Sequence, residues 1–282
     1  MKEQGLYLSG NACSQLYFSH WVPNGQARAV VAMVHGFGEH AGRYDAWAKR
    51  FNEQGVAFCA IDLPGHGLSS GKRGYVRSYE LLLKDIDTFL LKVTELYPSL
   101  PIILYGHSMG GNIVVNYAFR RRRFFKLLIV SSPWLSLTMP IPSYKMKFIE
   151  MMAHFFPRFT IKSPLDEADL SSISEVGINY IADPLVHNRM SMSLLCQVIK
   201  YGKNAIGQVY KITVPMFLTH GTADAFTSYK SSIEFARNTS DFITFKLWNE
   251  MGHELHHEVI KDQYFDAIME WIDVQLPLVS LS

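Results

Sequence analysis

Short apolar runs alternate with stretches of helical length along most of the chain. Continuous apolar runs in this rhythm are typical of a mainly parallel sheet covered by helices on both faces. Two early runs, Leu6–Leu8 and Gln15–Val22, have no helix between them and predict an antiparallel hairpin at the sheet edge. The remaining runs are Ala29–Val34, Val56–Ile61, Ile102–Leu104, Leu127–Val130, Met216–Leu218 and Ile243–Leu247.

The stretches between these runs predict helices. In Tyr79–Leu96 apolar residues recur at spacings of three and four, and Pro98 follows, as expected of a helix packed on a sheet. The other predicted helices are Tyr44–Gln54, Asn112–Arg122, Ser228–Arg237 and His257–Gln275. The predicted fold class is therefore α/β, with a mainly parallel eight-stranded sheet flanked by helices.

The alternation breaks between Pro133 and Ala205, where prolines punctuate helical pieces and no strand-like run appears. A structureless loop of roughly 70 residues is improbable inside a compact domain. We predict a helical cap at residues 136–205, inserted after the sixth strand. The α/β core then comprises residues 1–135 and 206–282.

The predicted cap carries a stripe of large apolar side chains. We expect most of them to pack the cap onto the core and the rest to line an apolar substrate channel, because Met and Phe adapt to a long apolar ligand. The stripe comprises Ile141, Tyr144, Phe148, Met152, Phe155 and Phe159, widened by Ile149, Met151 and Phe156.

The composition fits a compact globular protein. The chain has 282 residues, of which 48% are hydrophobic and 18% are charged, enough to bury a large core. A formal net charge of +2 does not indicate a nucleic-acid partner. The one basic run, Arg120–Arg123, fits the negative end of a helix better than a site for anionic lipid.

The cysteines and the N-terminal residues indicate the cellular compartment in which the protein is expected. Cys13, Cys59 and Cys196 are far apart and odd in number, which predicts buried free thiols in a reducing environment. The first residues lack a signal-peptide core, and no apolar stretch reaches the roughly 18 residues of a membrane span. We expect a cytoplasmic protein that contacts membranes at most transiently, through the cap.

One pentapeptide joins a predicted strand to a predicted helix in the pattern G-x-S-x-G, namely Gly106-His107-Ser108-Met109-Gly110. A serine at such a sharp turn is exposed as a nucleophile, and the glycines let strand and helix approach closely. A serine hydroxyl also needs an imidazole to accept its proton and a carboxylate to orient that imidazole. Ser108 is therefore the candidate nucleophile.

The acid and the base are predicted at two later strand ends. Asp224 follows the run Met216–Leu218, and His253 follows the next run, which completes the order Ser, Asp, His. The competing carboxylates are Asp62, which precedes the serine, and Asp241, which precedes its strand.

The competing bases are His256 and His257, which look like the start of the last helix. Glu254 and Glu258 would suit the positive end of that helix. The three histidines that include His253 do not form the H-E-x-x-H order of a metal hydrolase, so we expect no metal and no cofactor.

An oxyanion site requires two N–H donors, one directly after the nucleophile and one from the loop after an earlier strand. Met109 supplies the first. Phe37, within His35-Gly36-Phe37-Gly38, is the candidate for the second, because the flanking glycines permit the turn that aims its amide inward.

These motifs resemble the monoglyceride lipase and lysophospholipase-like branch of the α/β-hydrolases, which is related to the serine aminopeptidases. The combination of H-G-x-G-E-H and G-R-Y is more specific than the serine motif, and the cap is the least similar part. The matching segments are H-G-F-G-E-H at 35–40, G-R-Y at 42–44, D-L-P-G-H-G-L-S-S-G at 62–71, G-H-S-M-G-G at 106–111, H-G-T-A-D at 220–224 and G-H-x-x-H at 252–256.

The resemblance implies a site for the polar head of the substrate at Glu39, Arg43, His107, Tyr180 and His256. A simpler interpretation makes Glu39 and Arg43 a surface ion pair and His107 a brace of the turn. Phe37 stands where the family commonly has a small residue, which predicts a narrower entrance.

The leading hypothesis is a serine ester hydrolase that acts on small single-chain lipid esters, above all a monoacylglycerol. A lysophospholipase or a short-chain carboxylesterase is the alternative within enzymes. An aminopeptidase is disfavoured, because the cap shows no clear acidic cluster for a substrate's amino terminus. A non-catalytic binding protein of the same fold is the alternative from another class.

Overall fold

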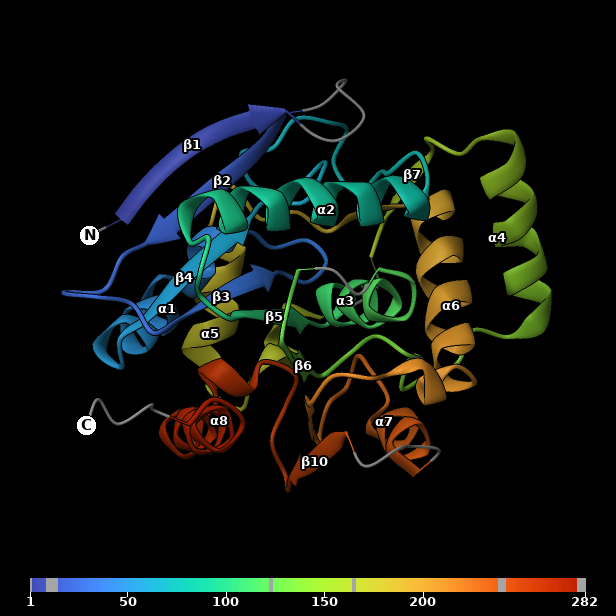
Figure 1. Cartoon of the computed structure of the whole chain (residues 1–282). Coiled ribbons are helices and arrows are strands. Elements are labelled where there is room, and N and C mark those ends of the chain that lie inside the picture. Colours follow the sequence, from blue (N-terminus) through green and yellow to red (C-terminus); the bar gives the residue numbers. More distant parts are fainter. Residues whose placement is uncertain (1, 9–14, 122–123, 164–165, 238–241, 278–282) are drawn as a thin grey trace.

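The computed structural model describes residues 2–8, 15–121, 124–163, 166–237 and 242–277. They form an eight-stranded sheet in the order β1-β2-β4-β3-β5-β6-β9-β10 (Figure 1). The predicted edge hairpin is present, since β1 (Lys2–Leu8) pairs antiparallel with β2 (Gln15–Trp21). The strand β2 is also antiparallel to β4, and the remaining pairs are parallel. The other strands are β3 (Ala29–Val34), β4 (Val56–Ile61), β5 (Ile102–His107), β6 (Leu127–Ser131), β9 (Met216–Gly221) and β10 (Ile243–Trp248).

Helices cover both faces of this sheet, which confirms the predicted α/β class (Figure 1). Side chains of β3 alternate between the faces, so that Val30 and Ala32 join one core and Val31 and Met33 join the other. The first core is covered by α2 (Tyr79–Leu96), α3 (Met109–Arg120), α6 (Met192–Ile206) and α7 (Tyr229–Arg237), and the second by α1 (Asp45–Glu53) and α8 (Lys261–Gln275).

The last helix begins later than the sequence predicts. Its first residue is Lys261 rather than His257, and Leu255–His257 form a separate 3-10 turn, η4. The predicted dipole role of Glu254 and Glu258 is therefore wrong, because both carboxylates hold other segments of the chain. Two other 3-10 turns, η1 (Ala41–Tyr44) and η3 (Val209–Lys211), lie elsewhere in the chain.

Between β6 and β9 the chain leaves the sheet and forms α4 (Ser143–Phe155), η2 (Glu167–Leu170), α5 (Ser174–Ala182) and α6. The expectation of no strand here was wrong, since β7 (Thr160–Lys162) pairs with β8 (Arg189–Ser191). Each strand has three residues, too few to produce a recognisable run. The insertion contacts the core through α6, where the Asn112 amide donates to the carbonyl of Val198 at 3.1 Å.

The apolar stripe of α4 is mostly exposed, contrary to the expectation that it packs on the core. No residue of α4 is buried, and Tyr144, Phe148 and Phe155 are 71%, 55% and 67% exposed. Ile141 and Ile149 do pack against the core. Helical spacing predicts that these residues share one face, but it does not indicate whether that face packs on the core or is exposed to solvent.

Three compositional predictions can be located in the structure. Cys59 is buried and Cys196 is half-buried, both as free thiols, whereas Cys13 lies outside the described residues. In the basic run, Arg120 and Arg121 pair with Glu80 of α2, and residues 122–123 are not described. Of the described helices, none is long and apolar enough to cross a membrane.

Candidate active site

Ser108 lies at a strained turn between β5 and α3. Its backbone angles are φ 55° and ψ −117°, in a region that side chains rarely adopt. The glycines on either side are required for space, because a Cβ on Gly110 would lie 2.0 Å from the Val34 carbonyl oxygen and one on Gly106 2.5 Å from the Gly110 oxygen. The close approach of β3, β5 and α3 thus holds the serine at the carboxyl ends of the strands.

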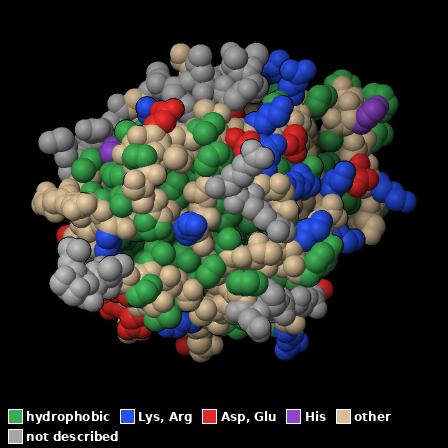
Figure 2. Space-filling view, in the orientation of Figure 1, with side chains coloured by type: hydrophobic (Ala, Val, Ile, Leu, Met, Phe, Trp, Pro, Cys, Tyr) green, Lys and Arg blue, Asp and Glu red, His purple; other side chains and the backbone are tan. Residues whose placement is uncertain are grey.

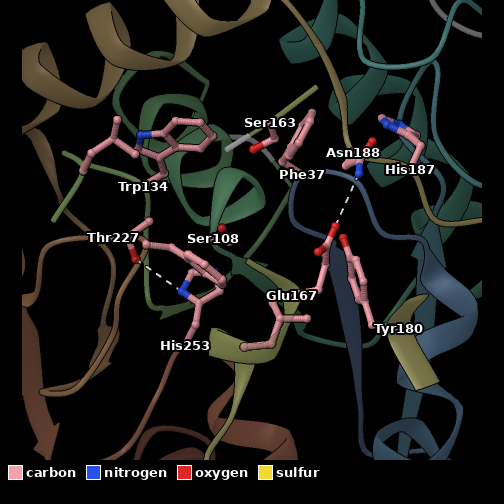
Figure 3. Close-up of a pocket in the computed structure, with 13 residues that line it drawn as sticks. Phe37, Ser108, Trp134, Ser163, Glu167, Tyr180, His187, Asn188, Thr227 and His253 are labelled. Carbon is pink, nitrogen blue, oxygen red and sulfur yellow. Dashed lines mark hydrogen bonds between the residues drawn. The ribbon is translucent and has the colours of Figure 1, made fainter. Parts of the chain in front are cut away.

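Ser108 opens into a pocket between the core and the insertion (Figure 3). His253 lies on the same pocket, and Trp134, Thr227, Glu167 and Tyr180 stand around it in Figure 3. The remaining lining residues are Phe37, Leu137, Ser163, Leu170, His187, Asn188 and Phe226.

Asp224 and His253 form a buried hydrogen-bonded pair. The Nδ1 atom of His253 lies 2.6 Å from Asp224 Oδ2, and because a carboxylate only accepts, Nδ1 carries the proton. The other Asp224 oxygen accepts from the backbone amides of Phe226 and Thr227, each at 2.8 Å. His220 Nε2 lies 3.0 Å from Oδ2, so the carboxylate is held from several directions.

The contact between His253 and Asp224 raises the pKa of the imidazole and lowers that of the carboxyl group, as a proton-accepting imidazole requires. Burial by itself lowers the pKa of His253, but the charge of Asp224 and the hydrogen bond to it raise this pKa above its ordinary value. Burial acts to raise the pKa of Asp224, yet His253 and His220 hold it well below its ordinary value. Asp224 is therefore an ionised partner across the neutral pH range.

The two residues predicted as oxyanion donors, Met109 and Phe37, both belong to segments next to Ser108. Met109 is the first residue of α3, so its N–H has no partner within the helix. Phe37 lines the pocket, and a Cβ on the preceding Gly36 would lie 3.0 Å from Ser108 Cβ. The loop is fixed by Glu39, whose Oε1 accepts from the Gly36 amide at 2.6 Å.

Glu39 and Arg43 are not a surface ion pair, so that simpler interpretation is wrong. Their side chains are 2% and 8% exposed. The Arg43 guanidinium donates to Glu39 at 2.9 Å and to both oxygens of Glu254, at 2.5 and 2.7 Å. Burial acts to raise the pKa of Glu254, but Arg43 holds it well below its ordinary value. At Glu39 burial prevails, and the pKa is raised despite Arg43.

Of the five residues predicted for a substrate head group, Tyr180 lines the pocket, Glu39, His107 and His256 are buried, and the Arg43 side chain is 8% exposed. Arg43 lies over the Tyr180 ring, 4.6 Å from its centroid. His107 is 4.8 Å from the ring of His253 and 5.2 Å from that of His256, measured between centroids. These four residues therefore support the pocket wall and do not form its surface.

Two of the competing residues, Asp62 and His257, have other partners. Asp62 accepts from the backbone amides of Ala41 and Leu68, both at 2.7 Å, and so joins two loops of the core. Asp241 lies outside the described residues. His257 Nδ1 lies 2.7 Å from Glu254 Oε2, and His257 is not among the residues that line the pocket of Ser108.

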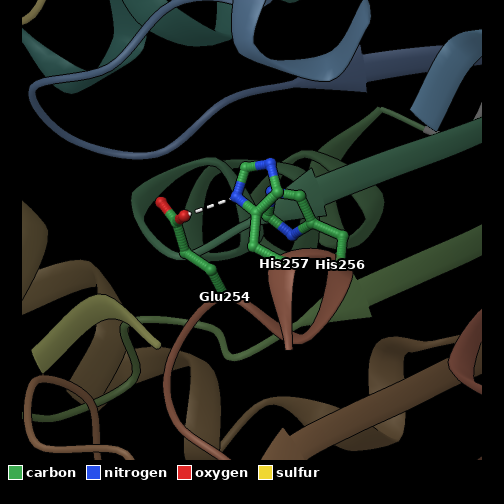
Figure 4. Close-up of side chains that lie close together, drawn as sticks. All are labelled: Glu254, His256 and His257. Carbon is green, nitrogen blue, oxygen red and sulfur yellow. Dashed lines mark hydrogen bonds and ion pairs between the residues drawn. The ribbon is translucent and has the colours of Figure 1, made fainter. Parts of the chain in front are cut away.

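One group of side chains could be mistaken for a metal centre. Ligand atoms of Glu254, His256 and His257 lie within 4.8 Å of one another (Figure 4). Both Glu254 oxygens already accept from Arg43, whose fixed positive charge would repel a metal cation. The donor set therefore fits an ion-pair network better than a metal centre.

Several site residues escaped the sequence analysis. Glu254 completes the Arg43 network, and Glu258 accepts from the amides of Gly252 and Ser172 at 2.7 and 2.9 Å, joining the His253 loop to the insertion. Glu167 and Asn188 line the pocket from the insertion. Glu254 occupies a variable position of the G-H-x-x-H segment and the other three stand in no motif, and partners such as Arg43 and Ser172 are distant along the chain.

Comparison with known proteins places this geometry among hydrolases. The family model described as serine aminopeptidase, S33, matches residues 25–260. A monoacylglycerol lipase of Mycolicibacterium smegmatis is 28% identical over 260 residues, spanning 92% of each protein. A crystal structure of Paleococcus ferrophilus monoacylglycerol lipase has a TM-score of 0.85 and 31% identity, covering 92% of this chain and 99% of that one.

A longer relative is also similar. An uncharacterized abhydrolase domain-containing protein of Dictyostelium discoideum is 33% identical over 255 residues. That match covers 89% of this chain and 27% of the Dictyostelium protein. The likeness therefore concerns one hydrolase domain of a much larger polypeptide.

Proposed function

This chain belongs to the serine aminopeptidase S33 family, in its monoglyceride lipase-like branch, and from this premise we propose that it hydrolyses monoacylglycerols through an acyl-enzyme on Ser108. The observation that carries the proposal is that Ser108 and His253 line one pocket while His253 Nδ1 lies 2.6 Å from Asp224. A Ser-His-Asp set of this kind performs acyl transfer on several unrelated folds.

In the proposed reaction His253 accepts the Ser108 proton as the serine oxygen attacks the ester carbonyl carbon. The amides of Phe37 and Met109 stabilise the oxyanion of the tetrahedral intermediate. His253 then protonates the departing glycerol oxygen, which leaves an acyl-serine. His253 then accepts a proton from a water molecule whose oxygen attacks the acyl carbon, and it returns that proton to the Ser108 oxygen as the fatty acid is released.

The choice of a long acyl chain rests on a second cavity beside the pocket. This cavity has a volume of about 450 Å³ and shares Trp134, Leu137, Ser163 and Phe226 with the pocket. Its walls are mostly apolar, with Met190 and Leu195 among them. An acyl chain would lie there, while the glycerol faces Tyr180, with Glu39, Arg43, His107 and His256 supporting that wall.

A substrate panel tests this function. Monooleoylglycerol is expected to exceed oleoyl-lysophosphatidylcholine and glyceryl monobutyrate in kcat/KM, each by about tenfold or more, because only the first combines a long chain with a neutral head. Initial rates of fatty-acid release on one enzyme preparation measure this order. A preference for the butyrate or the lysophospholipid would instead favour one of the alternative hydrolases.

We also propose that the insertion contacts a lipid surface transiently. Phe148, Phe155 and Phe156 of α4 and the residue after it are 55%, 67% and 60% exposed. Where α4 lies, Figure 2 shows hydrophobic side chains beside Lys and Arg side chains. Exposed apolar groups gathered in one patch mark interaction surfaces, and Ile141, two residues before α4, lines the apolar cavity.

Vesicle binding tests this contact. Phe148→Asp is expected to weaken binding to neutral phosphatidylcholine vesicles by about tenfold, because it removes roughly 1.5 kcal/mol of apolar burial. Val274→Asp on α8, where the valine is 75% exposed, adds the same charge away from the patch and should leave binding unchanged. Co-sedimentation measures both variants, and equal losses would refute the assignment to α4.

A further inference from the structure

Building on the proposed function, we propose that Glu167 sets the charge selectivity for the departing alcohol. Esters whose alcohol carries a negative charge are disfavoured, and neutral or cationic alcohols are accepted. Glu167 comes from η2 in the insertion, lines the pocket that contains Ser108, and accepts from the Asn188 amide at 3.4 Å. In Figure 3 the two side chains meet on the side of the pocket away from Trp134 and Thr227.

The charge inventory of the pocket singles out this carboxylate. Among the described lining residues, Glu167 is the one Asp or Glu, and none is Lys or Arg. His187 is neutral at pH 7, since burial lowers its pKa to about 4. The charge that His253 gains during catalysis is already matched by Asp224. No described lining residue therefore offsets the negative charge of Glu167.

The nearest guanidinium does not compensate for Glu167 either. Arg43 lies behind the ring of Tyr180, 4.6 Å from its centroid. Its two terminal nitrogens donate to Glu39 and to both oxygens of Glu254. A phosphate or carboxylate in the pocket would meet Glu167 without finding a free cation in the described wall.

The position of Glu167 assigns it to the alcohol side. The wall shared with the apolar cavity consists of Trp134, Leu137, Ser163 and Phe226, and Glu167 is not part of it. With the acyl chain in that cavity, the alcohol oxygen and its substituents face the opposite wall, where Glu167, Asn188 and Tyr180 lie. In a partly buried pocket like charges a few ångströms apart interact more strongly than in water.

The test uses octanoyl esters of three para-substituted phenols of similar size and different charge. The alcohols are 4-hydroxybenzoate, 4-hydroxybenzamide and 4-(aminomethyl)phenol, which are anionic, neutral and cationic. All three esters are used below their critical micelle concentrations, so no lipid surface contributes. Glu167→Gln keeps the shape and an acceptor for Asn188, and Glu175→Gln, an exposed residue of α5, removes the same charge outside the pocket.

We expect Glu167→Gln to raise kcat/KM for the anionic ester relative to the neutral one by about tenfold, and to lower that of the cationic ester severalfold. Glu175→Gln should leave both ratios at the wild-type values. Ratios of kcat/KM do not depend on the fraction of folded enzyme, so partial misfolding cannot mimic the result. Unchanged ratios, a uniform change for all three esters, or an equal effect of Glu175→Gln would overturn the role of Glu167.

The same preparations separate this inference from the proposed function. Hydrolysis of the neutral aryl ester without hydrolysis of monooleoylglycerol would remove monoacylglycerol as the substrate. The charge ratios would still decide whether Glu167 selects the alcohol. Conversely, active hydrolysis of monooleoylglycerol with unaltered charge ratios would leave the function standing and reject Glu167 as its selectivity determinant.

Discussion

The Ser108→Ala variant is expected to lose on the order of 10⁶-fold in kcat toward a nitrophenyl acyl ester. The acyl-enzyme cannot form without the hydroxyl, and the remaining pocket can only bind the ester. The variant should fold normally, because alanine occupies the same backbone conformation as the serine at φ 55°. Release of nitrophenolate measures the rate, and thermal unfolding checks the fold.

A second pocket serine provides the control. Ser163→Ala removes a buried hydroxyl from the same wall and is expected to change kcat by less than about tenfold, since only the nucleophile acts as a unit with the base. A fluorophosphonate probe should label the wild type and Ser163→Ala but not Ser108→Ala. Unlabelled wild type would favour the non-catalytic binding protein.

The Asp224→Asn variant is expected to lose roughly 10⁴-fold in kcat/KM. The Asn amide would face His253 Nδ1, now 2.6 Å from Asp224 Oδ2, and favour the tautomer whose Nε2 carries the proton and cannot accept another. Activity falls as pH falls through the pKa of His253, because only the neutral imidazole accepts the serine proton. Asp224 raises that pKa above 6.5, so the acidic limb of the variant's profile should move to lower pH.

Asp62→Asn is the matched comparison, since Asp62 is the carboxylate that competes with Asp224 in the sequence. Asp62 bonds the backbone amides of Ala41 and Leu68, so its replacement should lower thermal stability and leave the acidic limb of the pH profile in place. If the acidic limb of the pH profile shifted in Asp62→Asn and stayed in place in Asp224→Asn, Asp62 rather than Asp224 would be the partner of His253.

Much of the fold could be predicted because its signals are local. The runs that became β3 to β6 are continuous and apolar, since a strand buried on both faces has no polar positions. Helix α2 ends at Leu96 as predicted, and its start is fixed by Ser78, whose side chain accepts from the Leu81 amide. The turn at Ser108 is also local, because the two glycines that it needs are two residues away.

Other features depended on segments distant along the chain. The pairing of β7 with β8 joins residues near Ile161 to residues near Met190, which no run announces. Helix α8 begins at Lys261, and Glu258 before it accepts from the amides of Ser172 and Gly252, contacts that sequence periodicity cannot anticipate. The exposure of α4 followed from where the insertion sits, not from its apolar spacing.

The sequence by itself determined the α/β class, the candidate nucleophile and the order of its partners, because strand, turn and helix are encoded by near neighbours. Only the tertiary structure decided that Glu39 and Arg43 are buried with Glu254, and that Glu167 faces the pocket instead. The sequence does not show which glutamates are buried in ion pairs and which face a pocket. Their burial and partners are set by packing between residues as far apart as Arg43 and Glu254, and these contacts fix which charge meets a substrate.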